Sequence, residues 1–155
     1  MPPAPDSARG LLRHTVATLS YRAAKCLDGA TPAFPGFTVA PGARTPVEIL
    51  AHMGDLFDWA LALAQGHHTW KTSTPLPWEE ERARFFAALR TFDQYLESDR
   101  PLGWPPERLF QGPVADALTH TGQIAYLRRL AGIPVRGENY ARATIVAGGI
   151  AATYN

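Results

Sequence analysis

Cysteine is nearly absent from this sequence: Cys26 is the single one among 155 residues, so no internal disulfide can form. No apolar run is long enough to cross a membrane, and the proline-rich N-terminus lacks the hydrophobic segment of a secretory signal. The formal net charge of +1 gives no electrostatic reason to expect nucleic acid or an anionic membrane as a partner. We therefore expect a cytoplasmic protein, and the small-molecule substrate that we expect for it rests on the candidate site and the resemblance described below.

Hydrophobic residues, in contrast, make up 46% of the chain against 19% charged residues, a balance typical of an ordered globular protein. A chain of this length can bury roughly two-thirds of its unfolded surface around one core. The sequence contains no internal repeat and no low-complexity segment. Residues 1–155 are therefore expected to form a single domain.

The clearest helix start lies at Thr45, which precedes Pro46 and is followed three residues later by Glu48, the pattern of a capping box. Apolar residues then recur at intervals of three and four until Gly66, which predicts an amphipathic helix. His52 falls inside the apolar stripe of this helix. The two aspartates of the same helix, Asp55 and Asp58, are expected at the edge of the stripe, facing solvent.

Two more helices are predicted from similar patterns. The first begins at Asp6 or Ser7 and ends near Gly29, and the third runs from Trp78 to about Glu97. Cys26 is expected to be a small core residue of the first helix rather than a nucleophile. Three arginines of the third helix are expected to be solvated: Arg82, Arg84 and Arg90.

The connections are long and rich in helix breakers. Residues 30–44 contain three prolines and two glycines, which predicts a long loop with one short extended piece at residues 37–39. The polar connection up to Pro77 contains His67 and His68, which we expect to be solvated. A brief helical turn is expected at residues 107–110, and residues 137–155 should form an ordered tail on the surface of the helices.

The fourth long helix contains two metal-ligand residue types at helical spacing. Gly112 and Pro113 are expected to form its N-cap and first turn, and Gly132 its end. Asp116 and His120 are four residues apart, so their side chains are stacked one turn apart on a face that is otherwise apolar. That arrangement allows both side chains to bind the same ion.

Four amphipathic helices without a convincing strand between them predict an all-α protein, a four-helix bundle with long connecting loops. The long connections after helices one and three indicate that the topology is not a plain up-down-up-down arrangement. In such bundles, metal and cofactor sites are built from side chains on facing helices. Helix two, with His52, and helix four, with Asp116 and His120, contain the candidate ligands.

Each of these residues also has a simpler interpretation. A lone histidine in an apolar stripe is usually a hydrogen-bonded core residue. An aspartate such as Asp116 near a helix N-terminus can serve only to stabilise the helix dipole or to pair with an arginine.

The motifs around these residues resemble those of the DinB-like superfamily. The resemblance rests on Ala51-His52-Met53 in helix two and, in helix four, on the runs His120-Thr121-Gly122-Gln123-Ile124, Leu127-Arg128-Arg129 and Gly132-Ile133-Pro134. It implies a four-helix bundle in which a histidine of helix two and two residues of helix four bind a divalent metal. The implied ligands are His52, Asp116 and His120, although Asp116 stands where the family typically has histidine.

The resemblance also implies an enzyme, because relatives include thiol S-transferases and isomerases, mycothiol-dependent maleylpyruvate isomerase among them, that use mycothiol or bacillithiol. Zinc or nickel is the expected metal, with iron or manganese also compatible with two histidines and a carboxylate. Gln123 is expected to hydrogen-bond the reacting group as a catalytic residue. The alternatives are a metal-dependent hydrolase, a non-catalytic module that binds a small ligand, and a stress-associated bundle protein that acts as a homodimer.

Overall fold

The computed structural model describes residues 7–151, and within them every regular element is helical and no strand occurs. The long helices are α1 (Ser7–Leu27), α2 (Pro46–Ala64), α3 (Trp78–Glu97) and α5 (Ala115–Leu130). The short ones are η1 (Phe34–Gly36), α4 (Pro106–Leu109), the π-helical turn η2 (Phe110–Val114) and η3 (Tyr140–Arg142). The prediction of an all-α protein is confirmed for this part of the chain. Asp6, the alternative start predicted for the first helix, and the last four residues of the tail lie outside the described residues.

The four long helices pack around one core. Both α1 and α2 contact α3 and α5, so α1 and α2 lie diagonally opposite each other. The core contains a cluster of fully buried aromatic rings, in which the Phe57 ring of α2 lies 6.1 Å from Phe85 and 5.7 Å from Phe92 of α3. The apolar stripes read from the sequence therefore do face a shared interior.

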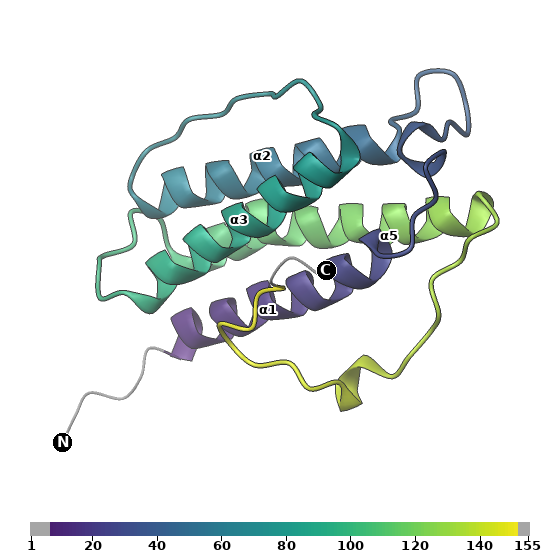
Figure 1. Cartoon of the computed structure of the whole chain (residues 1–155). Coiled ribbons are helices and arrows are strands. Elements are labelled where there is room, and N and C mark those ends of the chain that lie inside the picture. Colours follow the sequence, from purple (N-terminus) through teal and green to yellow (C-terminus); the bar gives the residue numbers. More distant parts are fainter. Residues whose placement is uncertain (1–6, 152–155) are drawn as a thin grey trace.

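The helices do not alternate in direction (Figure 1): α1 and α5 run one way, while α2 and α3 run the other. Residues 65–77 therefore cross the whole length of the bundle between the end of α2 and the start of α3. The 19 residues of α2 span about 28 Å, and thirteen extended residues reach about 43 Å, so this connection is long enough. A plain up-down-up-down topology was rightly excluded, but the decisive crossover follows helix two, not helices one and three.

The predicted boundaries of α2 are confirmed. The Thr45 hydroxyl accepts a hydrogen bond from the backbone N–H of Glu48, at 3.4 Å. At the other end Gly66 has a φ of +90°, and the N–H of His67 reaches the carbonyl of Ala62 at 2.8 Å. This left-handed turn is one that glycine adopts without strain.

The predicted start of the fourth helix is wrong. Gly112 and Pro113 do not cap it, because the chain is already helical from Pro106 and passes through the π-helical turn η2 into α5 without leaving helical dihedral angles. Pro113 lacks the N–H that a regular α-helix would use, and the wider turn accommodates that loss. Leu109 and Val114 are both fully buried although they are five residues apart. Residues on one face of a regular α-helix are three or four positions apart, so this spacing corresponds to one residue inserted into the helix.

The other end of this segment follows the prediction. Gly132 has a φ of +79°, and the N–H of Ile133 donates to the carbonyl of Arg128 at 3.0 Å. That bond and the one from the N–H of Gly132 to the carbonyl of Arg129 form the pair that closes a helix end around a left-handed glycine.

The loop and the tail lie against the helices. The 3-10 helix η1 places Phe34 in the core, where its ring lies 5.9 Å from that of Trp78. Phe37 directly after it has the extended conformation predicted for this piece, and residues 37–39 form no strand. The tail is held along α1: Glu138 accepts from Lys25 at 2.7 Å, and the N–H of Ala151 donates to Ser20 at 2.8 Å. The expectation of an ordered tail on the helices is confirmed as far as Ala151. Among the helices of residues 7–151, none is long and apolar enough to cross a membrane.

Candidate metal centre

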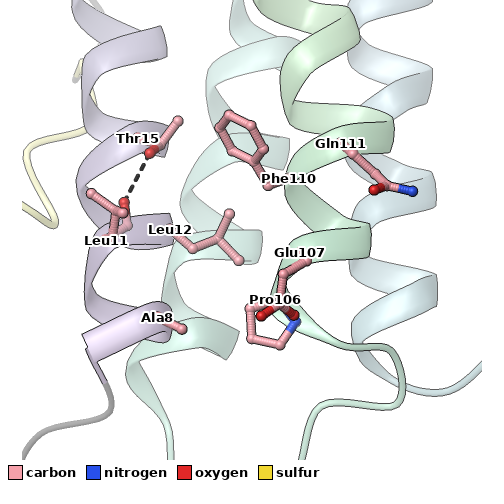
Figure 2. Close-up of a pocket in the computed structure, with 8 residues that line it drawn as sticks. All are labelled: Ala8, Leu11, Leu12, Thr15, Pro106, Glu107, Phe110 and Gln111. Carbon is pink, nitrogen blue, oxygen red and sulfur yellow. Dashed lines mark hydrogen bonds between the residues drawn. The ribbon is translucent and has the colours of Figure 1, made fainter.

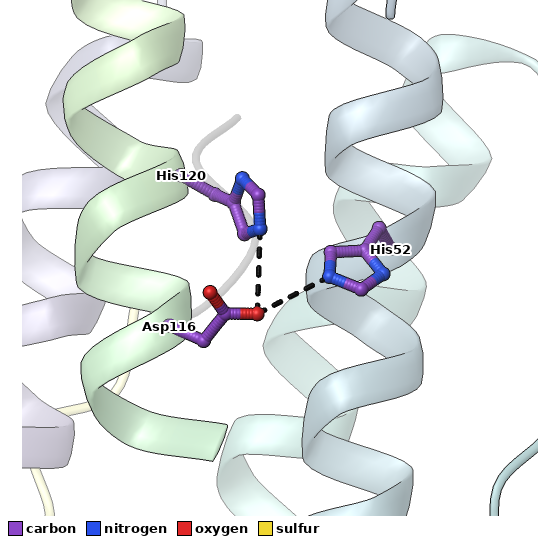
Figure 3. Close-up of side chains that lie close together, drawn as sticks. All are labelled: His52, Asp116 and His120. Atoms are coloured by element: carbon purple, nitrogen blue, oxygen red, sulfur yellow. Dashed lines mark hydrogen bonds and ion pairs between the residues drawn. The ribbon is translucent and has the colours of Figure 1, made fainter. Parts of the chain in front are cut away.

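His52 of α2 faces Asp116 and His120 of α5 (Figure 3). One carboxylate oxygen of Asp116 lies 3.3 Å from Nε2 of His52 and 3.4 Å from Nε2 of His120. One ligand atom from each of the three residues lies within 4.8 Å of the other two. All three residues predicted as metal ligands are therefore brought together, and they form a group that can hold a metal ion.

The π-helical turn contributes to this arrangement. An inserted residue turns the following part of a helix by about 100° relative to a regular α-helix. Asp116 comes two residues after the turn, so the turn sets the direction in which Asp116 and His120 point. Because the helical segment begins at Pro106, Asp116 does not lie at its N-terminus. The helix-dipole explanation for this aspartate therefore loses its basis.

The three side chains lie at the boundary between core and solvent. The exposed fractions are 12% for the side chain of His120, 20% for His52 and 46% for Asp116. Burial lowers the pKa of His52, and the positive field of Arg44 also lowers it, against the opposing effect of the hydrogen bond to Asp116. A lowered pKa keeps the imidazole of His52 neutral at physiological pH, which is the form that binds metals.

The protonation of His120 follows from its other nitrogen. Nδ1 lies 2.7 Å from the amide oxygen of Gln123, and an amide oxygen can only accept, so Nδ1 carries the proton in this arrangement. In a neutral ring Nε2 is then an unprotonated acceptor, and it faces the carboxylate oxygen of Asp116 at 3.4 Å. Two acceptors at that distance repel each other unless a positive charge, a proton or a metal ion, lies between them.

Gln123 is therefore connected to the candidate metal centre by its hydrogen bond with His120. It lies on the exposed side of α5, one turn beyond the histidine. In this position it holds the imidazole in one tautomer and orientation, the usual function of a hydrogen-bond partner behind a metal ligand. Its expected catalytic contact with a reacting group stays a prediction.

Trp70, which the sequence analysis did not select, covers one side of the centre. Its ring lies 5.6 Å from that of His52 and 5.8 Å from that of Trp59. Trp70 belongs to the crossover connection, where sequence spacing gives no indication of which helix face it reaches. His68 of the same connection packs against Trp59 and Trp104 rather than near the candidate ligands.

A network of charged side chains fixes that connection to α2 and α3. Asp55 accepts from the N–H of Ser73 at 2.9 Å, and Glu81 accepts from the N–H of Leu76 at 3.0 Å. Arg84 pairs with both carboxylates, at 3.2 Å and 3.0 Å. The backbone on either side of residues 74–75 is therefore anchored to two buried acids that share one guanidinium.

This network corrects two predictions. Asp55 does not face solvent but is 4% exposed, because its carboxylate is satisfied by Ser73 and Arg84. Arg84 is not solvated either, since its guanidinium lies on α2 and donates to the carbonyl of Ala51 at 2.7 Å. The close approach requires Gly54, where a Cβ atom would lie 2.7 Å from the guanidinium carbon.

The other two arginines predicted to be solvated are also paired, Arg82 with Asp28 and Arg90 with the carbonyl of Ala151.

Cys26 lies apart from the centre and is buried, as predicted. Burial raises the pKa of its thiol, the nearby cations Arg128 and Lys25 opposing that rise. A thiol with a raised pKa is a poor nucleophile at neutral pH. Cys26 is therefore not expected to act as a nucleophile at the candidate centre.

A separate apolar groove lies between α1 and α4 (Figure 2). Its volume is about 750 Å³, and its walls include Leu11, Leu12 and Phe110. It shares no lining residue with the His52, Asp116 and His120 group. The groove therefore gives no access to the candidate centre.

No family model, no curated protein and no solved structure matches this chain.

Proposed function

We propose that this protein is a divalent-metal-dependent enzyme of the thiol S-transferase type and a member of the DinB-like superfamily. The observation that carries the proposal is the convergence of Nε2 of His52, one carboxylate oxygen of Asp116 and Nε2 of His120. These atom types are common metal ligands, and the three residues each place one such atom within 4.8 Å of the others. The resemblance in sequence motifs names the same three positions.

The donor set fits a divalent transition metal. Two ligands bound tetrahedrally at about 2.1 Å from an ion are about 3.4 Å apart, close to the two separations from Asp116, 3.3 Å and 3.4 Å. Two imidazoles and a carboxylate suit zinc and nickel, and also iron and manganese. Three protein ligands are the usual number for a metal that keeps a further position open.

A divalent cation held there supplies Lewis acidity, which lowers the pKa of a thiol or of water and so yields a nucleophile at neutral pH. Asp116 is nearly half exposed, so the centre is open to solvent on its side. Trp70 packs edge-on against the ring of His52. Gln123 accepts a hydrogen bond from Nδ1 of His120 and so holds the ring with Nε2 directed at the centre.

The choice between transfer of a thiol and hydrolysis depends on which nucleophile is activated. Cys26 is not expected to supply the thiol, because it is buried, its thiol pKa is raised and it is not a member of the ligand group. A low-molecular-weight thiol is therefore the proposed co-substrate. With water in its place the same residues would support hydrolysis, which is the alternative reaction.

Metal content of purified protein tests the proposal directly. We expect about one equivalent of a transition metal in the wild type after reconstitution, and almost none in His52→Ala, because two ligands from one helix do not replace a three-ligand set. His67→Ala serves as the matched control, since His67 is an exposed histidine outside the ligand group, and it should keep the full metal content.

The reaction class is tested on the metal-loaded protein. Consumption of bacillithiol or mycothiol by a soft electrophile should be faster with loaded wild type than with His52→Ala. Less than half an equivalent of metal in the reconstituted wild type would contradict the metal centre. Full metal content with no acceleration of thiol transfer would instead contradict the reaction.

A further inference from the structure

A second hollow lies directly beside His120. It is formed by residues 39–44, the first turn of α2 and the middle of α5, and its volume is about 330 Å³. His120 and Gln123 form the side nearest the candidate metal centre. A molecule in this hollow would therefore contact the His120 ring, whose other edge faces Asp116.

The walls of this hollow are apolar. Ile49 and Leu127 are buried members of the core and form its base. Val39 and Tyr126 also line it but are large apolar side chains left exposed, Tyr126 at 62%. An apolar ligand would cover this exposed surface, and the volume lies at the lower end of the range for small-molecule sites. The hollow thus fits a compact apolar group.

Arg44 supplies the only permanent charge in the lining, and no aspartate or glutamate is among the lining residues. Within residues 7–151, no carboxylate or carbonyl forms an ion pair or hydrogen bond with its guanidinium. The arginines Arg13, Arg84 and Arg128, in contrast, are all paired with acids or carbonyl groups.

We propose that this hollow is the substrate subsite, and that it binds a small carboxylate whose apolar body lies between Ile49, Tyr126 and Leu127 while its carboxylate pairs with Arg44. Arginine matches a carboxylate in geometry, because its guanidinium offers two parallel N–H donors. The inference rests on the proposed function, to which it adds the class of substrate: an electrophile with a carboxylate group near an apolar or aromatic body.

The test uses a probe that needs no metal. Chelator-treated full-length protein is titrated with 3-phenylpropanoate and with its neutral analogue 3-phenylpropanamide, and binding is followed by NMR shifts of the protein. The acid should bind about tenfold more tightly than the amide, since a hydrogen-bonded charge pair is worth roughly that factor. Arg44→Gln should abolish the preference for the acid, and Arg44→Lys should keep part of it.

Arg142→Gln is the matched control, because Arg142 is an exposed arginine that does not line the hollow. It should leave the preference unchanged. Equal affinity for acid and amide, a preference that survives Arg44→Gln, or no binding of the acid at millimolar concentration would each overturn the inference.

Metal content measured on the same variants separates this inference from the proposed function. Arg44→Gln should keep the wild-type metal content, since Arg44 is not among the ligands. Protein that binds the acid through Arg44 but never binds metal would contradict the metal centre alone. Protein that binds metal but does not prefer the acid would contradict the subsite alone.

Discussion

The side chain of Asp116 contacts both histidines of the candidate metal centre, one on α2 and one on α5. Its carboxylate lies between two imidazole nitrogens, and it does not lie at the start of a helix, because helical backbone extends ten residues upstream to Pro106. An aspartate with no terminus to stabilise is best explained by what it contacts. Its contacts are His52 and His120.

We expect Asp116→Ala to lose most of its metal affinity and Asp116→His to keep the metal, because imidazole binds the same ions from the same helix position. Metal stoichiometry after reconstitution measures both outcomes. Asp99→Ala, which removes an exposed aspartate outside the ligand group, should leave the stoichiometry unchanged. Equal metal content in wild type and Asp116→Ala would show that the carboxylate is not a ligand.

Cys26 gives a second prediction at the residue scale. Because it is buried and its thiol pKa is raised, the folded protein should react with a thiol reagent such as DTNB much more slowly than protein unfolded in guanidinium. Cys26→Ser should leave metal content unchanged, and thiol transfer by the metal-loaded protein should continue without this thiol. A stoichiometric, rapid reaction of the native protein would be incompatible with the buried position.

At the scale of elements, buried charges hold the crossover connection to α2 and α3, in addition to the ring contacts of Trp70 and His68. Asp55 and Glu81 each accept a backbone N–H from this connection, and Arg84 neutralises both acids. The connection in turn contains Trp70, which packs on His52. The same charged side chains that pair between α2 and α3 therefore also hold the segment that contains Trp70, the residue that packs on His52.

We expect Arg84→Met to destabilise the fold by about 3 kcal/mol, because Asp55 and Glu81 would stay buried without their cation. Gly54→Ala should also destabilise, since the added Cβ would displace the guanidinium. Urea unfolding followed by circular dichroism measures both changes. Arg142→Met is the control and should change the free energy of unfolding by less than about 0.5 kcal/mol. An unaltered midpoint in Arg84→Met would mean that the network contributes no net stability.

For the whole molecule, a metal ion bound by His52, Asp116 and His120 would connect α2 to α5, two of the four long helices. A ligand that binds only the folded state raises the free energy of unfolding by about 2.7 kcal/mol at a hundredfold excess over its Kd. The thermal midpoint of the apo protein should therefore rise with added metal, and chelator should reverse the rise. His52→Ala should show no such response, whereas His67→Ala should respond as the wild type does.

The sequence alone determined the features that depend on near neighbours in the chain. Thr45 begins α2 because its hydroxyl reaches the Glu48 N–H, and Gly66 and Gly132 end their helices because glycine adopts positive φ without strain. The spacing of Asp116 and His120 places them on one helix face in any fold that keeps the helix. These effects depend on residues that are close together in the chain, so the sequence was sufficient to predict them.

The tertiary structure decided what depends on distant segments. His52 meets Asp116, 64 residues away, only because α2 packs against α5. The burial of Asp55 and Glu81 beside Arg84 likewise follows from the packing of α2 against α3, and the position of Trp70 beside His52 follows from the path of the crossover connection. Residue types and spacing alone do not predict these contacts. A charged side chain is expected to be solvated unless a second helix or a crossing segment buries it and supplies its partner.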